Sequence, residues 1–213
     1  MIGLIKKDFY IYLGSGQLKY ITLFILLYGI IGITSNNMSF LSAAMVAFVA
    51  VFPINSISLD QNCHWNAFAV TMPVKRKDII INKYIISSIL ILIGGTLSII
   101  CSFFMKSSFT ENLFVTIVIL SLSLIWAAIS YPIIFKMGIE KGKLISMGII
   151  VIPVVIGVAV GKEIVNFLVQ FMNFNKFETF FENYGYLILF VMSILIYVIS
   201  GLISIKIFER KDL

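Results

Sequence analysis

The sequence has little charge and very little cysteine or histidine. Of its 213 residues, 12% are Asp, Glu, Lys or Arg, and it holds two cysteines and a single histidine. Two isolated cysteines argue against a disulfide framework or a thiolate metal site, so Cys63 and Cys101 are interpreted as ordinary apolar residues. His64 has no second histidine and no intramembrane carboxylate with which to complete a ligand set or a triad. We therefore expect neither a catalytic nor a metal site.

Ionisable residues are missing from long parts of the chain. No Asp, Glu, Lys, Arg or His occurs between Tyr20 and Ile57 or between Leu113 and Phe135. Proton relays and ion-coupled carriers need such groups within the membrane, so a transporter driven by an ion gradient is not expected. A P-loop is missing too, because the most similar stretch, GIEKGKL at residues 138–144, is one residue short and ends in Leu. If the chain takes part in transport, the energy must come from outside its membrane region.

Long apolar runs make up most of the chain. Hydrophobic residues are 60% of it and the mean hydropathy is +1.06, which is typical of helical membrane proteins. A membrane-spanning helix needs about 20 apolar residues, which leaves room for about six. The runs lie at residues 20–34, 38–58, 79–105, 113–135, 144–161 and 184–207. The sequence thus predicts an all-α integral membrane protein with six transmembrane helices, in a single domain over residues 1–213.

Positive charge is distributed unevenly over the connectors. Thirteen of the 16 Lys and Arg residues fall on one set of connectors and on the chain ends, whereas three, Lys106, Lys162 and Lys176, fall on the other. By the positive-inside rule, both termini and the connectors at 59–78 and 136–143 face the cytoplasm. Topology and anionic lipid explain the net charge of +6, and no basic stripe interleaved with aromatics indicates nucleic-acid binding.

The connector at residues 59–78 concentrates the polar chemistry of the chain. As a single helix over residues 59–72, it would place Trp65, Phe68 and Met72 on one apolar face. The polar residues from 60 to 66 would then be exposed. This pattern fits a docking element for a cytosolic partner, and it fits equally a membrane-surface loop with snorkelling cations.

The N-terminal segment, residues 1–19, predicts an amphipathic helix at the membrane interface. Ile5 and Phe9 share an apolar face, while Lys6 and Lys7 are expected to face lipid headgroups. A plain membrane anchor would have the same pattern.

Other segments are assigned by their polarity. Lys83 and Tyr84 are expected to anchor the third span at the interface. Residues 162–183 are too polar to span, so they should form an amphipathic extracellular segment that lies at the outer interface or re-enters partway. Three polar residues of the second span are candidates for lining a pathway, or for packing against each other: Ser42, Asn55 and Ser56.

One series of residues resembles a known signature. In order, it consists of Asp60, Gln61, Asn62, Trp65, Phe68, Ala69, Thr71, Met72, Pro73, Val74, Arg76, Ile79, Ile80, Lys83 and Tyr84. This order is similar to that of the small ABC-2-type permease subunits of bacterial ABC transporters, as is the opening at residues 4–9, LIKKDF. Phe68 and Gln61 depart from it, since many members have Tyr and Glu there. The family includes permeases similar to the phenol-soluble-modulin exporter and those of bacteriocin and antibiotic immunity systems.

The resemblance implies a set of roles. The N-terminal helix would be an elbow helix, formed in part by Ile5, Lys6, Lys7 and Phe9. The cytoplasmic connector would couple to a separate ATPase through Asp60, Gln61, His64, Trp65, Phe68, Thr71, Pro73 and Arg76. That ATPase would bind ATP and Mg, so this chain would need no cofactor.

The resemblance also implies partners and a location. A second permease copy, identical or related, would complete the pathway in the bacterial cytoplasmic membrane, among membrane lipids. The expected activity is export of an amphipathic or hydrophobic substrate such as a membrane-active peptide. Two alternatives remain: an immunity permease of the same architecture, and a membrane scaffold or sensor that transports nothing.

Overall fold

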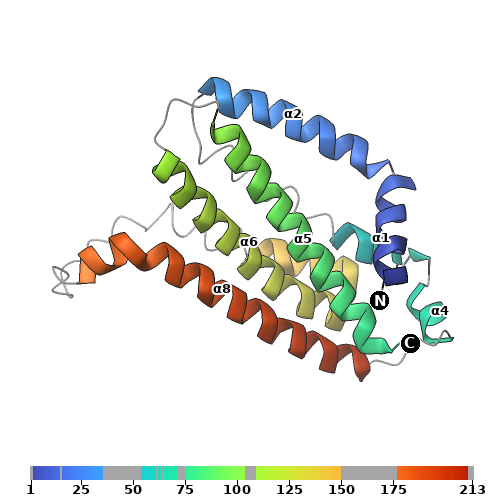
Figure 1. Ribbon diagram of the computed structural model, residues 1–213. Helices are drawn as coiled ribbons and strands as arrows, with labels where there is room; N and C mark the ends of the chain where they lie inside the picture. The colour runs from blue at the N-terminus through green and yellow to red at the C-terminus, as the bar shows by residue number, and fades with distance from the viewer. Residues whose placement is uncertain are drawn as a thin grey trace.

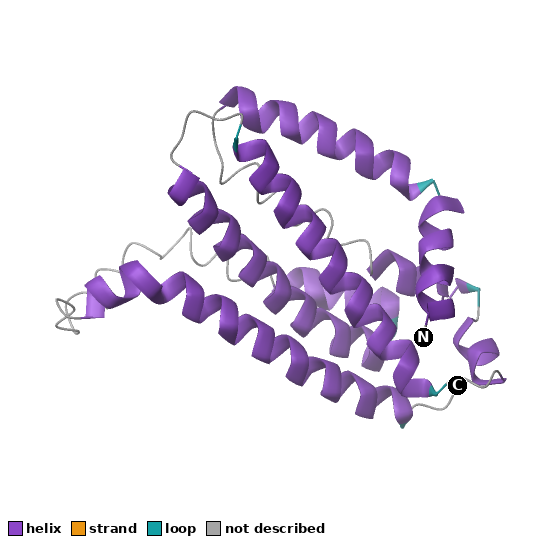
Figure 2. Ribbon diagram, in the orientation of Figure 1, coloured by secondary structure: helices purple, strands orange, loops and turns teal. Residues whose placement is uncertain are grey.

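The computed structural model describes the chain over residues 2–14, 16–35, 54–60, 62–63, 65–71, 75–103, 109–149 and 177–210. These residues form helices and the short turns between them, and no strand occurs within the described ranges (Figure 2). The all-α prediction is therefore confirmed. The second predicted span is described only from residue 54 and the fifth only as far as residue 149, so Ser42 lies outside the described residues.

The helices follow in chain order. They are α1 (Ile2–Gly14), α2 (Gln17–Ser35), α4 (Trp65–Thr71), α5 (Arg76–Ser102), α6 (Phe109–Met137) and α8 (Phe177–Glu209) (Figure 1). Residues 54–60 and 139–149 are helical as well. Among the described residues, three helical segments are long and apolar enough to cross a membrane: Arg76–Ser102, Phe109–Met137 and Gly185–Glu209. They correspond to the third, fourth and sixth predicted runs.

Helices α6 and α8 run parallel to each other. The rings of Phe114 and Tyr186, near the start of each apolar segment, have centroids 5.4 Å apart, and those of Phe135 and Phe208, near the two ends, are 6.0 Å apart. Helix α5 runs the opposite way, because Arg76 at its start donates from Nη1 to the carbonyl oxygen of Glu209, 3.2 Å away. The start of α5 and the ends of α6 and α8 thus lie together (Figure 1).

Close packing between α5 and α6 depends on a glycine. A Cβ at Gly95 would lie 2.8 Å from Cδ2 of Leu120, closer than such atoms approach in real structures. The missing side chain lets Leu120 of α6 rest directly on the α5 backbone. The buried core continues toward the polar end of the bundle through Ile91, Leu124 and Tyr131. A small residue such as Gly95 is expected at a contact between membrane helices, because lipid supplies no hydrophobic force between them and close packing has to hold them together.

The turn after α6 is shorter than predicted. The sequence indicated a connector over residues 136–143, but α6 continues to Met137 and the next helical residues begin at 139. Gly138 makes this turn with φ of 83°, a left-handed conformation that glycine adopts without strain. Gly142 then packs against α6, since a Cβ there would be 2.7 Å from Cα of Ile134.

Two other boundaries correct the predictions. Within the described residues, the single helix expected over residues 59–72 is interrupted: residues 54–60 and Asn62 are helical, Cys63 lies in a turn, and α4 begins at Trp65. The outer amphipathic segment expected over residues 162–183 is described from 177, where its residues already belong to α8. Residues 162–176 lie outside the described residues.

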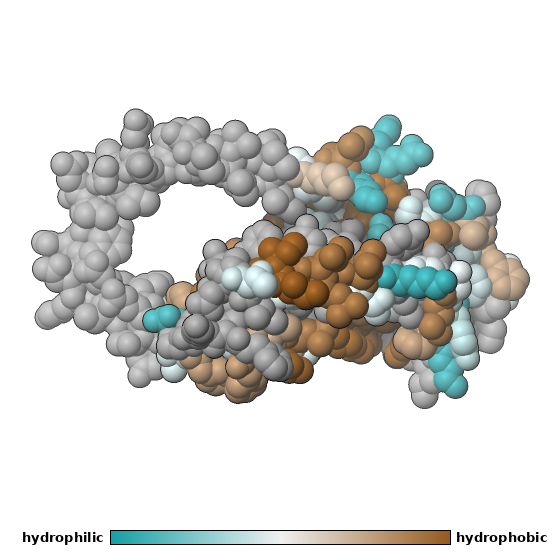
Figure 3. All heavy atoms as spheres, turned by 90° about the horizontal axis from the view of Figure 1, so that it is seen from above, coloured by the Kyte–Doolittle hydropathy of each residue, from teal (hydrophilic) through white to brown (hydrophobic). Residues whose placement is uncertain are grey.

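Polar side chains gather at one end of the bundle. Figure 3 shows apolar atoms over the middle of the visible face and hydrophilic atoms mainly toward the end where α1, α4 and the start of α5 lie. Exposed leucines and isoleucines cover much of α8, among them Leu195, Ile199 and Leu202. An apolar belt with a polar end fits a helix bundle surrounded by lipid.

Candidate functional site

Asp8 of α1 lies at the centre of a buried charged junction. Its side chain has no exposed surface. Its Oδ1 is 2.8 Å from the Lys83 ammonium of α5, and its Oδ2 accepts a hydrogen bond from Asn82 Nδ2 at 2.8 Å. Ser56 Oγ donates to Oδ1 at 3.3 Å and accepts from Lys83 at 2.8 Å. One carboxylate therefore joins α1, residues 54–60 and α5.

Asp60 completes the junction with a second carboxylate. Its Oδ1 is 2.6 Å from the Lys7 ammonium, and its Oδ2 is 2.6 Å from that of Lys83. Lys7 also lies 3.1 Å from Asp8. Each lysine thus contacts both carboxylates, and the four charges sum to zero. We call Lys7, Asp8, Ser56, Asp60, Asn82 and Lys83 the charged junction.

Local sequence explains how these side chains meet. Ser56 and Asp60 are four residues apart on one helix, which places them on the same face one turn apart. Lys7 and Asp8 are neighbours on α1, so they approach this face from adjacent directions. Lys83 sits in the second turn of α5, deep enough to be buried and close enough to the helix start to reach both carboxylates.

Trp65 connects the charged junction to α4. The Lys7 ammonium lies 4.5 Å from the centroid of the Trp65 ring, a distance at which a cation is attracted to the face of an indole. The ring also packs against Phe68, with centroids 5.6 Å apart. Phe68 itself is 54% exposed, and Thr71 is exposed one turn further. Helix α4 thus has one side fixed to the charged junction and another that faces outward.

The charged junction holds elements of the fold together through buried ion pairs. Both lysines and both carboxylates are engaged with each other, and no group of His, Cys, Asp or Glu within the described residues could hold a metal ion. Removing one partner of a buried ion pair costs about 3–5 kcal/mol, because the other charge is left uncompensated. The elements that meet here are therefore hard to separate, and they should move together.

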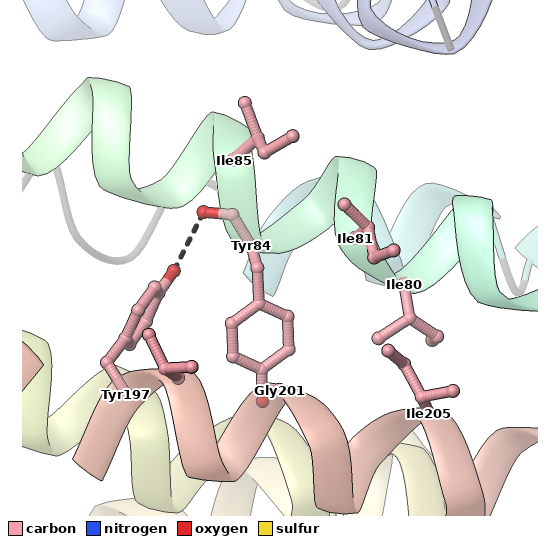
Figure 4. Close-up of a pocket in the computed structure, with 8 residues that line it drawn as sticks. Ile80, Ile81, Tyr84, Ile85, Tyr197, Gly201 and Ile205 are labelled. Atoms are coloured by element: carbon pink, nitrogen blue, oxygen red, sulfur yellow. Dashed lines mark hydrogen bonds between the residues drawn. The ribbon is translucent and has the colours of Figure 1, made fainter. Parts of the chain in front are cut away.

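A second, neutral junction lies on the other side of α5. Tyr84 Oη is 2.8 Å from Ser200 Oγ and 2.7 Å from Ser204 Oγ of α8. The hydroxyl of Tyr197 donates to the carbonyl oxygen of Tyr84 at 2.8 Å (Figure 4). The ring of Tyr131 from α6 meets that of Tyr84 edge-on, with centroids 4.9 Å apart. We call these five residues the hydroxyl junction.

Several predicted site residues are buried rather than exposed. Asp60 was expected to be available to a partner, but only 3% of it is exposed and it is ion-paired. Lys7 was expected to face headgroups and instead contacts both carboxylates. Lys83 and Tyr84 were expected at the interface and are buried, Lys83 against the two carboxylates and Tyr84 against serines of α8. Lys7, Asp60 and Lys83 each pair with a buried group of opposite charge, and Tyr84 bonds to serine hydroxyls, so none of them depends on water for a partner. The local sequence does not reveal these partners, because they come from other elements.

Other predicted residues keep an outward position or have other contacts. Lys6 and Phe9 of α1 are exposed and Ile5 is partly so. Asn55, a candidate for pathway lining, accepts a hydrogen bond from Lys143 at 3.4 Å. Arg76 joins α5 to the end of α8. Gln61, His64 and Pro73 lie outside the described residues.

Sequence reasoning missed Asp8 and Asn82 as site residues. Each stands next to a lysine, in Lys7-Asp8 and Asn82-Lys83. A carboxylate, Asp8, in a largely apolar N-terminal helix that also holds Lys6 and Lys7, and a lysine inside a predicted span, are signals, because intramembrane charges are normally paired. Pairing the two would have found the charged junction.

The chain was compared with protein families, curated proteins and solved structures. The model of the ABC-2 family transporter protein matches residues 3–209, nearly the whole chain. The chain belongs to this family. An ABC-2 protein is a permease of an ABC transporter, its multi-pass membrane component, which generally is not itself catalytic and works with an ATPase component. No curated protein and no solved structure matches the chain.

Membership of the ABC-2 family gives the charged junction a context. The residues that resemble the permease signature include Asp60, Trp65, Lys83 and Tyr84, and all four take part in contacts between elements. In this structure, these four signature residues join neighbouring elements at one end of the bundle.

Proposed function

We propose that this chain is the permease subunit of an exporter, and that its charged junction transmits the movement of a cytosolic ATPase to the membrane helices. The proposal rests on one observation: α1, residues 54–60 and α5 meet in one buried ion-pair network, and α4 is attached to this network through Trp65. Family membership supports the ATPase partner.

Six crossings are part of this proposal. Helices α6 and α8 are parallel, so residues 138–176 connect the polar end of one to the far start of the other. Helices α2 and α5 also point the same way in Figure 1, so residues 36–75 make a similar return. One crossing in each of these two connections would give six with α2, α5, α6 and α8, and both termini on one side. The charge distribution favours the cytoplasm for that side.

The outward side of α4 is the proposed ATPase contact. Phe68 and Thr71 are exposed on it, and Asn62 is exposed in the preceding turn. An exposed aromatic side chain on a short helix suits insertion into a hydrophobic groove of a partner. ATP and Mg would be bound by that partner, and closure of two ATPases would move two permease copies as rigid bodies.

An amphipathic or hydrophobic substrate, such as a membrane-active peptide, fits this permease best. Within the described spans, buried polar side chains are mainly hydroxyls such as Thr116, Ser121 and Ser123, each bonded to its own helix. A pathway between helices with so few charged side chains would suit a substrate that has few charges of its own. Self-protection against an antibiotic or bacteriocin would use the same architecture, and a scaffold that recruits a cytosolic protein would use α4 alone.

The ATPase contact is tested by co-purification. The chain is co-expressed with a candidate ABC ATPase from the same cell, and complex is captured from detergent for wild type, Phe68→Ala and the exposed control Phe9→Ala on α1. We expect Phe68→Ala to lose at least tenfold of the captured ATPase and Phe9→Ala to retain it. Equal capture by all three would exclude α4 as the contact. Failure of the wild type to capture any ATPase would contradict the permease proposal and favour the scaffold.

Export and immunity are separated in cells that lack the gene. Export predicts that an amphipathic peptide disappears from the medium on deletion. Immunity predicts killing by an added peptide with no change in what the cells release. A cell that shows neither effect would favour the scaffold.

A further inference from the structure

An apolar groove lies on the outer surface between α5 and α8, near the polar end of the bundle. It has a volume of about 140 Å³ and is open along one side (Figure 4). Its walls include Ile80, Ile81 and Ile85 of α5 and Val198, Gly201 and Ile205 of α8. Because Gly201 has no side chain, α8 leaves space opposite the Tyr84 ring.

Cationic side chains lie at the adjoining ends of the two helices that form this groove. Lys77 is exposed and lies one helical turn before Ile80 and Ile81, on the face of α5 that forms the groove. The Arg76 contact with Glu209 holds the start of α5 to the end of α8, which brings Lys206 to the same end. Residues 75–78 and 206–210 hold five basic and two acidic side chains, a net charge of +3.

We propose that this groove binds an anionic phospholipid from the leaflet at the polar end. One acyl chain would occupy the apolar walls, and the phosphate would lie among the cations at Lys77 and Lys206. A groove without cations would accept any lipid tail, whereas a net positive charge at its mouth selects a headgroup of net negative charge. The proposal concerns the lipid-facing side of α5 and α8 and does not depend on the transport role.

Lipid binding is measured on the purified full chain in a neutral detergent, by native mass spectrometry with added phosphatidylglycerol or phosphatidylcholine of identical acyl chains. We expect phosphatidylglycerol to bind at least tenfold more tightly. Replacing Lys77 and Lys206 by Gln should weaken it about 30-fold, since each cation near a membrane surface contributes about a fivefold factor. The control pair Lys136→Gln and Lys141→Gln, exposed at the same end on other helices, should bind as wild type does.

A groove-filling variant tests the apolar part. Gly201→Leu puts a side chain into the groove without a backbone clash, because its Cβ would be 3.7 Å from the Tyr84 ring. It should weaken phosphatidylglycerol at least tenfold, whereas Gly148→Leu, in open space, should not. The charge variants decide the matter if Gly201→Leu does not fold. Equal affinity for both lipids, or equal loss in the control pair, would overturn the proposal. So would a lipid-free dimer that Gly201→Leu dissociates, because a second copy would then cover the groove.

Discussion

Two adjacent residues of α5, Lys83 and Tyr84, face two different kinds of contact. Lys83 points to the charged junction and meets Asp8 of α1 and Asp60 of the helical residues 54–60. Tyr84 points to the hydroxyl junction and meets serines of α8. Within one turn, α5 joins the short N-terminal elements on one side and the long membrane spans on the other.

The two junctions differ in the free energy needed to break them. Hydroxyl contacts between membrane helices contribute about 0.6 kcal/mol each, so small rearrangements of α6 and α8 against α5 are inexpensive. Breaking a buried ion pair costs several times more. We therefore interpret the charged junction as the rigid part of the molecule and the hydroxyl junction as the part that can adjust when the pathway opens.

The largest effect is expected from Asp8→Ala. This change leaves Lys83 and Lys7 with one carboxylate between them in a buried site, and it should lower the free energy of unfolding by about 3–5 kcal/mol. Lys6→Ala is the matched control on the same helix, because Lys6 is exposed, and it should change stability by about 0.5 kcal/mol or less. Denaturant titration in detergent measures both. Equal stability of the two variants would show that the charged junction is not a rigid element.

A double-mutant cycle sharpens this result. If Lys83 and Asp8 interact directly, the combined Asp8→Asn and Lys83→Met variant should be less destabilised than the sum of the single changes, by about 1–3 kcal/mol. Additive effects would mean that the two residues stabilise the protein independently.

An intermediate effect is expected at the turn after α6. Gly142→Ala would force a Cβ to within 2.7 Å of the Ile134 backbone, and such overpacking costs about 1–3 kcal/mol. Gly148→Ala is the control on the same helical stretch, where nothing lies within 4 Å of the new Cβ. Thermal unfolding followed by tryptophan fluorescence distinguishes them. If Gly142→Ala melts with the wild type, the fold between α6 and residues 139–149 is looser than described.

The smallest effect is expected in the hydroxyl junction. Tyr84→Phe removes one hydroxyl shared by Ser200 and Ser204 and should cost about 1 kcal/mol. Tyr10→Phe, at a position that is 68% exposed, should cost nothing measurable. The same unfolding assay reports both. A loss at Tyr84 as large as that at Asp8 would contradict the contrast between a rigid and an adjustable side of α5.

Apolar runs of membrane length were sufficient to predict an all-α membrane protein and three of its spans. The runs at 79–105, 113–135 and 184–207 were placed within a few residues of the spans in α5, α6 and α8, because long apolar helices are local features of sequence. Helix ends were less predictable. Gly138 ends α6 in a one-residue turn, and a sequence with Lys and Glu around it reads as a longer loop.

The candidate site was predicted only in part. The resemblance pointed to Asp60, Trp65 and Lys83, but composition alone suggested that polar residues near a membrane surface face water or headgroups. Their burial depends on Asp8, which comes 75 residues before Lys83 in the chain. A contact between residues so far apart in the chain leaves no periodic pattern in the sequence. Charged residues in apolar surroundings were therefore the one indication that a buried ion pair exists.

ATP hydrolysis by the co-purified complex in lipid tests the central claim most directly. Asp8→Asn preserves the shape of a side chain that is buried away from α4, so it should bind the ATPase as wild type does while lowering hydrolysis by the complex at least fivefold. Lys6→Gln should change neither quantity. Full activity of an Asp8→Asn complex that binds the ATPase normally would contradict transmission through the charged junction.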